Sequence, residues 1–262
     1  MKKLLSIVLV LCLSLGLVAC GSKAEKENAS DLGYITDKGK LVVGITDYEP
    51  MDFKGDDGEW TGFDAEFAKV VAKELGVDVE FIEIDWDNKA MELESKSIDC
   101  VWNGMTLTEE VQNAMECSNP YVENAQVVVM AADKAGNYKD ADSMKDLKFA
   151  AESGSAGEAA IKDSGLDANY TAVSTQADAL MEVASGSADA CVIDITMANA
   201  MTGEGTSYAN LASGISLTSE KYVIGFRKGS DAAAKVNEIM AKYMSDGTLD
   251  KLAEKYSLTL VK

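Results

Sequence analysis

The stretch MELESKSIDCVWNGMT, Met91–Thr106, decides the fold, because MEVASGSADACVIDI at Met181–Ile195 repeats its pattern 90 residues later. Five residues are identical at this one shift: Met91, Glu92, Ser95, Ser97 and Asp99 recur as Met181, Glu182, Ser185, Ser187 and Asp189. Each copy reads as the end of a helix, a short polar turn and a buried strand. A chance match between two amphipathic helices followed by apolar strands is the alternative, and five identities at one register favour a repeat.

The two predicted strands end in polar or small residues. The first ends in Asn103-Gly104-Met105-Thr106 and the second in Asp194, and the shift makes Gly104 and Asp194 equivalent. Ligands of α/β sheets bind beyond the carboxyl ends of the strands. The repeat therefore predicts two similar lobes with a ligand cleft between them.

Composition restricts the function. The chain has 262 residues, 47% of them hydrophobic and 26% charged, as in folded globular proteins, and a net charge of −20. This acidity disfavours nucleic acid as a partner, because basic patches bind phosphates. Histidine is absent and no cysteine pair has metal-ligand spacing. We therefore expect no metal, no cofactor and no histidine-based catalysis.

The N-terminus has the pattern of a targeting segment, predicted at residues 1–19. Lys2-Lys3 precedes an apolar run, Leu4–Leu17, that is too short to span a membrane. The run leads into Leu17-Val18-Ala19-Cys20, which resembles the lipobox of bacterial lipoproteins, so Cys20 is the expected lipid anchor. An ordinary secretory signal cut near Ala19 is the alternative. Residues 20–32 are polar and predict a flexible tether to the membrane.

Three cysteines remain besides the anchor and the leader. Cys100 and Cys191 lie in apolar strands, where a buried reduced thiol is the default state. A disulfide between Cys100 and Cys117 is left open by the spacing.

Strands and helices alternate along the rest of the chain, which predicts an α/β fold. Lys54–Gly58 has the turn residues of a hairpin tip. Asp64 is the expected N-cap of a helix that ends at Gly76. Ser155 and Glu158 have the spacing of a capping box, so a second helix is expected to begin there.

An ordered set of motifs is similar to the solute-binding proteins, family 3, that serve ABC importers of polar amino acids. The similarity covers about Gly39–Tyr256, and each motif is weak alone but specific in this order. The motifs are Gly39-Lys40-Leu41-Val42-Val43-Gly44, Gly62-Phe63-Asp64, Asp85-Trp86-Asp87, Asn103-Gly104-Met105-Thr106-Leu107-Thr108, Ser118-Asn119-Pro120-Tyr121, Glu152-Ser153-Gly154-Ser155, Ala188-Asp189-Ala190, Gly225-Phe226-Arg227-Lys228-Gly229 and Asp246-Gly247-Thr248.

The resemblance implies the two-lobed periplasmic-binding-protein fold, in which two α/β domains are joined by a two-strand hinge with the ligand cleft between them. Residues 33–120 plus 223–262 would form the first lobe, and residues 126–217 the second. The hinge would be residues 121–125 and 218–222. One copy of the repeat then falls in each lobe.

The resemblance also implies ligand-binding residues in the first lobe. Tyr48 and Trp86 match aromatic residues that cover two sides of the ligand, and such a pair holds an apolar or a cationic side chain. Ordinary core packing is the alternative for both. Gly104 and Thr106 match the pocket floor, where a backbone carbonyl and a hydroxyl meet the amino-acid head group, and Asn103 is their neighbour.

In the second lobe, the resemblance points to a helix start and a strand end. Ser155 and Ala156 begin a helix whose free N–H groups and dipole suit a ligand carboxylate. A plain cap is the alternative role for Ser155, and the two roles are compatible. Asp194 matches the acidic residue that takes the ligand's ammonium group, with a simple surface charge as the alternative.

One position departs from the family pattern. Relatives usually carry an arginine four to five residues after Gly-Met-Thr, which clamps the ligand carboxylate, and Val111 occupies that place here. Glu152 stands where some relatives carry lysine. Arg227, the single arginine of the chain, lies in a different strand and does not substitute. Lys89 is the nearest cationic candidate, although a solvated surface lysine is the favoured interpretation.

Three classes of function remain. The favoured hypothesis is a monomeric, lipid-anchored, extracytoplasmic binding protein without enzyme activity. It would close on a small nitrogenous solute, a neutral or cationic amino acid or a related amine, and deliver it to the membrane permease of an ABC importer. A dehydratase-like enzyme on the same fold, with Glu152 or Asp194 as acid or base, is the alternative. A sensor module is disfavoured, because no signalling segment is evident in the sequence.

Overall fold

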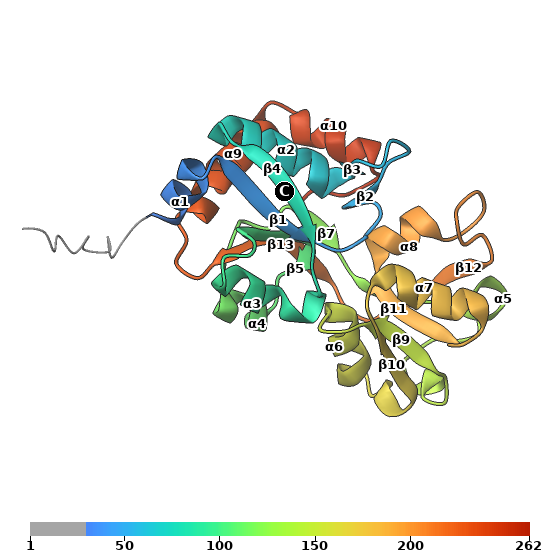
Figure 1. Ribbon diagram of the computed structural model, residues 1–262. Coiled ribbons are helices and arrows are strands. Elements are labelled where there is room, and N and C mark those ends of the chain that lie inside the picture. Colours follow the sequence, from blue (N-terminus) through green and yellow to red (C-terminus); the bar gives the residue numbers. More distant parts are fainter. Residues whose placement is uncertain (1–29) are drawn as a thin grey trace, which may run out of the picture. The chain divides into compact units, whose positions relative to one another are not determined.

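The computed structural model describes residues 30–262, in which helices and strands alternate around two sheets (Figure 1). The predicted signal peptide, the anchor Cys20 and most of the tether lie outside the described residues. Helix α1 (Asp31–Asp37) was not predicted, and its first two residues belong to the predicted tether. Within residues 30–262, no helix combines the length and apolarity needed to cross a membrane.

The first sheet has the strand order β4-β1-β5-β13-β6, with β7 also paired to β13. Its strands are β1 (Lys40–Ile45), β4 (Asp78–Glu83), β5 (Cys100–Thr106), β6 (Met115–Cys117), β7 (Val122–Asn124) and β13 (Glu220–Arg227). The surrounding elements are the hairpin β2 (Phe53–Lys54) and β3 (Trp60–Thr61), the short helix η1 (Trp86–Asn88), and helices α2 (Phe63–Leu75), α3 (Lys89–Glu94), α4 (Glu109–Ala114), α9 (Ala232–Ser245) and α10 (Thr248–Lys255). Figure 1 shows α2 and α9 on one face of this sheet and α3 and α4 on the other.

The second sheet has the order β10-β9-β11-β8-β12. Its strands are β8 (Gln126–Ala131), β9 (Phe149–Glu152), β10 (Tyr170–Val173), β11 (Ala190–Asp194) and β12 (Leu211–Ser216). Its helices are α5 (Ala132–Ala135), α6 (Ala156–Asp163), α7 (Gln176–Ser185) and α8 (Ile195–Met201), with the short helices η2 (Asp142–Met144) and η3 (Asp167–Asn169). Helix α6 packs on one face, and α7 and α8 pack on the other. We call each sheet with its helices a lobe.

The repeat is the organising unit of both lobes, as predicted. Strand β5 lies between parallel β1 and antiparallel β13, and strand β11 lies between parallel β9 and antiparallel β8. Cys100 is opposite Val43, and Ala190 is opposite Phe149, so positions 100 and 190 are equivalent in three dimensions. Such central strands are buried on both faces, which explains the apolar runs Cys100–Trp102 and Ala190–Ile193 at their starts.

The repeated aspartates have the same structural role in both lobes. The Asp99 carboxylate accepts a hydrogen bond from the Val42 N–H (2.8 Å), and the Asp189 carboxylate accepts one from the Lys148 N–H (3.0 Å). Each aspartate therefore fixes the start of the repeat strand against its parallel neighbour.

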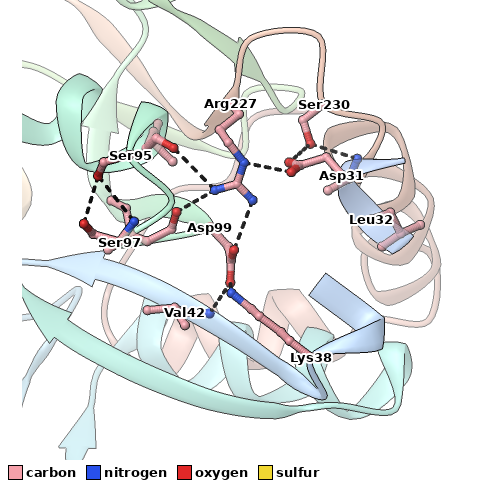
Figure 2. A network of polar contacts seen from close by, with 12 residues as sticks. Asp31, Leu32, Lys38, Val42, Ser95, Ser97, Asp99, Arg227 and Ser230 are labelled. Carbon is pink, nitrogen blue, oxygen red and sulfur yellow. Dashed lines mark hydrogen bonds and ion pairs between the residues drawn. The ribbon is translucent and has the colours of Figure 1, made fainter. Parts of the chain in front are cut away.

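Arg227 stabilises the first lobe and does not reach the ligand cleft. Figure 2 shows its guanidinium between Asp31 of α1 (2.7 Å) and Asp99 of the repeat (3.0 Å). Lys38 lies 2.5 Å from the other oxygen of the fully buried Asp99. The single arginine thus joins α1, β13 and the repeat turn, and it is not among the residues that line the cleft described below.

One expectation about local structure was wrong, the N-cap of α2. Gly62 is the N-cap of α2, with φ 113°, and a Cβ there would lie 2.3 Å from the Met51 carbonyl oxygen. Asp64 instead lies inside the first turn, fully buried, and accepts hydrogen bonds from the Tyr121 hydroxyl (2.8 Å) and the Gly104 N–H (2.7 Å). The Cys100–Cys117 pairing, which the spacing left open, is decided by the structure: among the described residues both are free thiols.

The chain passes between the lobes twice. The first passage runs through Ala125, between β7 and β8, and the second runs between β12 and β13. Glu220 at the start of β13 is paired with Asn124 of β7, so the two passages lie side by side. The hinge and lobe boundaries expected from the sequence agree with this path and stay predictions.

Candidate ligand cleft

A cleft of about 570 Å³ lies at the carboxyl ends of the repeat strands. Both lobes contribute to its walls. Seven of the eight predicted ligand residues line it: Trp86, Asn103, Gly104, Thr106, Ser155, Ala156 and Asp194. The position agrees with the rule for ligand sites in α/β sheets.

Tyr48 is the exception, because it lies behind the cleft floor. Its side chain is 1% exposed, and its hydroxyl is hydrogen-bonded to Thr196 (2.5 Å) and to Tyr222. A Cβ on Gly104 would lie 2.6 Å from the Tyr48 ring, so the floor there requires glycine, which also adopts φ 55°. Tyr48 therefore packs behind Gly104. The predicted contact between Tyr48 and the ligand remains a prediction, and the buried location of Tyr48 does not favour it.

Asn103 and Thr106 use their side chains within the protein. Asn103 is 2% exposed, accepts from the Thr46 N–H (3.0 Å), and donates to the Thr46 carbonyl (3.0 Å) and to Asp52 (2.8 Å). The Thr106 hydroxyl donates to Glu220 (2.9 Å). Asn103 thus holds the end of β1 in place, and Thr106 has lone pairs left to accept from a ligand.

Asp194 is a buried carboxyl at the end of β11, held by amide groups. One oxygen accepts from Asn124 and from Gln126 (2.8 Å), and the other accepts from Gln176. Burial raises the pKa of Asp194 to about 6, the charge of Glu220 adds to this, and the amide hydrogen bonds from Gln176 and Asn124 oppose it. The group is therefore mostly ionised at pH 7 and suited to hold a cation.

Glu220, at the start of β13, is a second carboxyl near Asp194 that the sequence analysis missed. It accepts hydrogen bonds from Thr106 (2.9 Å), Gln126 (2.9 Å) and Thr218 (2.7 Å). Because Gln126 also donates to Asp194, the two carboxylates share donors from the first passage between the lobes. No local signal identifies Glu220, since its partners lie far away in sequence.

Glu152 ends strand β9 and lines the cleft. It is 3% exposed, and among the described residues its Oε1 atom has no hydrogen-bond partner. Burial raises the pKa of Glu152 to about 8, the charge of Asp194 adds to the rise, and Lys89 opposes it. The carboxyl is therefore mostly protonated at pH 7.

Lys89 is not the solvated surface lysine that we expected. Its ammonium is half-buried in the cleft wall and donates to the carbonyls of Trp86 (3.1 Å) and Gly154 (3.0 Å). It also lies 5.0 Å from the centre of the Trp86 ring. Burial lowers the pKa of Lys89. The expectation failed because Gly154, which completes this site, belongs to the other lobe.

Trp86 and Val111 form an apolar part of the cleft wall. Both are 7% exposed and pack with Leu93, Met105 and Met115. Val111 follows Thr108, which caps helix α4 by accepting from the Val111 N–H (3.1 Å). An apolar surface thus stands where relatives place the clamp arginine.

The start of helix α6 agrees with the predicted cap. The Ser155 hydroxyl accepts from the Glu158 N–H (3.1 Å), and the Glu158 carboxylate accepts from the Gly154 N–H (2.8 Å). Ser155 therefore acts as the N-cap of α6, which begins at Ala156. The first N–H groups of a helix have no carbonyl partner within the helix, so this end of α6 is suited to bind an anion.

The cleft wall is acidic. Its carboxyl residues are Asp87, Glu109, Glu110, Glu152, Glu158, Asp163 and Asp194, and its amines are Lys89 and Lys162. Lys162 is paired with Glu158 at 2.7 Å. In the part of the chain that the structure describes, no three acidic or cysteine side chains are arranged for a metal ion.

Two lobes of matching topology with a polar cleft at their facing strand ends define the class of two-lobed solute-binding proteins. The chain belongs to the bacterial extracellular solute-binding proteins, family 3, whose model matches residues 41–259. It is therefore the solute-binding component of an ABC importer.

Named relatives support this assignment. The glutamine-binding protein GlnH of an ABC transporter from Bacillus subtilis (strain 168) is 32% identical over 270 residues, covering 98% of this chain and 97% of that protein. The L-cystine-binding protein TcyJ of Escherichia coli (strain K12) is 28% identical over 246 residues, covering 93% and 92%. The crystal structure of the ancestral amino acid-binding protein AncCDT-1, a precursor of cyclohexadienyl dehydratase, is 35% identical with a TM-score of 0.79, covering 87% of this chain and 99% of that one.

Proposed function

We propose that the ligand cleft binds a neutral or cationic amino acid or a related amine, and that closure of the two lobes delivers it to the importer's permease. The observation that carries this proposal is Asp194, an amide-held carboxylate at the strand end of the cleft. A charged hydrogen bond from a ligand ammonium to such a group contributes about 1.5–3 kcal/mol.

The carboxylate of an amino acid would be held without an arginine. The first N–H groups of α6, at Ala156 and Gly157, offer donors aligned with the helix dipole. The Lys89 ammonium adds a positive charge in the same wall, although two carbonyls already use two of its three donors. The backbone carbonyl of Gly104 and the lone pairs of Thr106 would receive the ligand ammonium together with Asp194.

Acidic amino acids should be excluded. A second carboxylate would enter a wall with seven carboxyls and two amines, and the apolar Val111 offers it no positive charge. Like charges at short distance repel, and a buried carboxylate without a partner loses its hydration.

A thermal-shift screen of the amino acids and simple amines tests this proposal. Neutral or cationic compounds should give the largest stabilisation, because a ligand that binds only the folded state raises the melting temperature. If glutamate or aspartate gave the largest shift, our interpretation of the cleft's charge would be wrong.

We further propose that the protein is a monomer held outside the cytoplasm by a lipid on Cys20, with residues 121–125 and 218–222 as the hinge. The extracellular family and the sequence pattern of the N-terminus support this location. We also propose that it acts as a binding protein and not as an enzyme. Glu152 is the group that favours the dehydratase-like alternative, because it is a buried acid in the cleft and a neighbour by structure is a dehydratase precursor. Recovery of unchanged ligand after incubation supports binding, and turnover supports the enzyme.

A further inference from the structure

Glu152 has a buried oxygen that lacks a hydrogen-bond partner among the described residues. Its side chain is 3% exposed, it lines the cleft, and its Oε1 has no hydrogen-bond partner within residues 30–262. A buried polar atom normally has a partner, because losing water without one costs free energy. The position of Glu152 in the cleft wall makes a bound solute the natural partner.

The charges around Glu152 select the type of partner. Asp194 at the end of β11 and Lys89 on α3 line the same cleft as Glu152. Burial and the charges of Asp194 and of Asp178 on α7 raise the pKa of Glu152, whereas the charge of Lys89 and a hydrogen bond with Thr46 lower it. The Lys89 ammonium is already directed to two backbone carbonyls. The neighbourhood thus has more negative than positive charge, and a cation is the partner that it stabilises most.

We propose that Glu152 is a specificity-determining residue that binds a second positively charged nitrogen of the solute, while Asp194 binds the first. The solute class is then a basic amino acid or a short diamine. This inference rests on the proposed function and narrows it from neutral or cationic compounds to compounds with two cationic nitrogens.

Binding of such a solute should release a proton. Burial raises the pKa of Glu152 to about 8, so the empty cleft holds a neutral carboxyl at pH 7. When the solute's second ammonium binds, the carboxyl loses its proton to the buffer and forms an ion pair. Binding at pH 7 should therefore release protons, and the affinity should rise with pH between pH 6 and 8.

The test compares L-lysine, 1,5-diaminopentane and L-norleucine, which has the carbon chain of lysine without the second amine. Titration calorimetry at pH 7 in two buffers of different ionisation enthalpy gives both the affinity and the protons released. Wild-type protein should bind lysine at least ~10-fold more tightly than norleucine, and Glu152→Gln should weaken lysine by ~10- to 150-fold. Norleucine binding should change by less than ~3-fold. Glu94→Gln makes the same substitution at an exposed carboxyl on α3 outside the cleft wall and serves as control.

Several results would overturn the inference. One is lysine binding by Glu152→Gln at wild-type affinity. Another is binding that weakens as the pH rises through 8, which would mean that Glu152 donates its proton to the solute. Proton release by wild-type protein is measured without any variant, so a Glu152→Gln protein that fails to fold leaves the test intact. If neutral amino acids bind and lysine does not, this inference fails and the proposed function stands. If no amino acid or amine binds, both fail.

Discussion

Replacing Asp194 with asparagine is the perturbation that most directly probes the cleft. The substitution removes the negative charge at the end of β11 with almost no change of shape. Each oxygen of Asp194 accepts from amide groups, so the new NH₂ group must face either Gln176 or the pair Asn124 and Gln126. One donor then meets another donor, which costs about 1–3 kcal/mol of folding stability.

An opposite effect offsets that cost. The folded-state pKa of Asp194, about 6, lies about 2 pH units above its ordinary value of 3.8, so keeping this group ionised in the folded state costs about 3 kcal/mol. Asparagine has no such cost. The free energy of unfolding at pH 7 should therefore change little, and the variant should remain folded.

Ligand affinity should fall sharply. The ligand ammonium loses a charged hydrogen bond of about 1.5–3 kcal/mol, which corresponds to ~10- to 150-fold in Kd. Titration calorimetry with the identified ligand measures this change. Asp189→Asn is the matched control, because Asp189 precedes the same strand, accepts a backbone hydrogen bond from Lys148 and does not line the cleft. An unchanged Kd for Asp194→Asn, with circular dichroism showing a folded protein, would refute the assignment.

Three further perturbations test other parts of the molecule. Arg227→Ala leaves the fully buried Asp99 with Lys38 as its remaining ion-pair partner. Urea titrations should show a free energy of unfolding lower by about 3 kcal/mol, and Arg227→Lys should recover part of this loss. A loss below about 0.5 kcal/mol would contradict the role of Arg227. The pKa of Glu152 is raised from 4.5 to about 8 in the folded state. Between these pH values the unfolded chain therefore binds fewer protons than the folded protein. The contribution of Glu152 to the free energy of unfolding should then fall by about 1.4 kcal/mol per pH unit as the pH rises from about 5 to 8. Urea titrations across this range should show that Glu152→Gln removes this component, and parallel curves for the two proteins would disprove it. Cys20→Ala should yield a soluble or uncleaved precursor, and detergent-phase partitioning equal to wild type would count against a lipid anchor.

The sequence was sufficient to predict the architecture because the repeat is local. Each copy spans about fifteen residues, and its apolar strand, polar turn and aspartate specify one helix-to-strand unit without reference to the rest of the chain. The two sheets then follow from placing each repeat strand beside a parallel neighbour, and the cleft follows from the strand ends.

The features that the sequence did not reveal depend on distant contacts. Lys89 is fixed by a carbonyl at Gly154, and Tyr48 is held behind Gly104 by Thr196 and Tyr222. Asp64 has the local sequence pattern of a helix N-cap. The N-cap is instead Gly62, because the Met51 carbonyl lies too close to that position for any residue with a Cβ, and Asp64 accepts a hydrogen bond from Tyr121. The Glu152 oxygen that has no partner within residues 30–262 is recognised only once the whole cleft is assembled, so the motif that contains Glu152 does not reveal it.

Mass spectrometry of the ligand released from purified protein tests the central claim most directly. The protein would be purified under native conditions, denatured, and the released small molecules identified. The structure predicts an intact amino acid or amine with a neutral or positive net charge, because the buried Asp194 and Glu152 line a cleft that has Val111 in place of a clamp arginine. Release of a dicarboxylate such as glutamate, or of the products of a reaction on the added compound, would contradict this account.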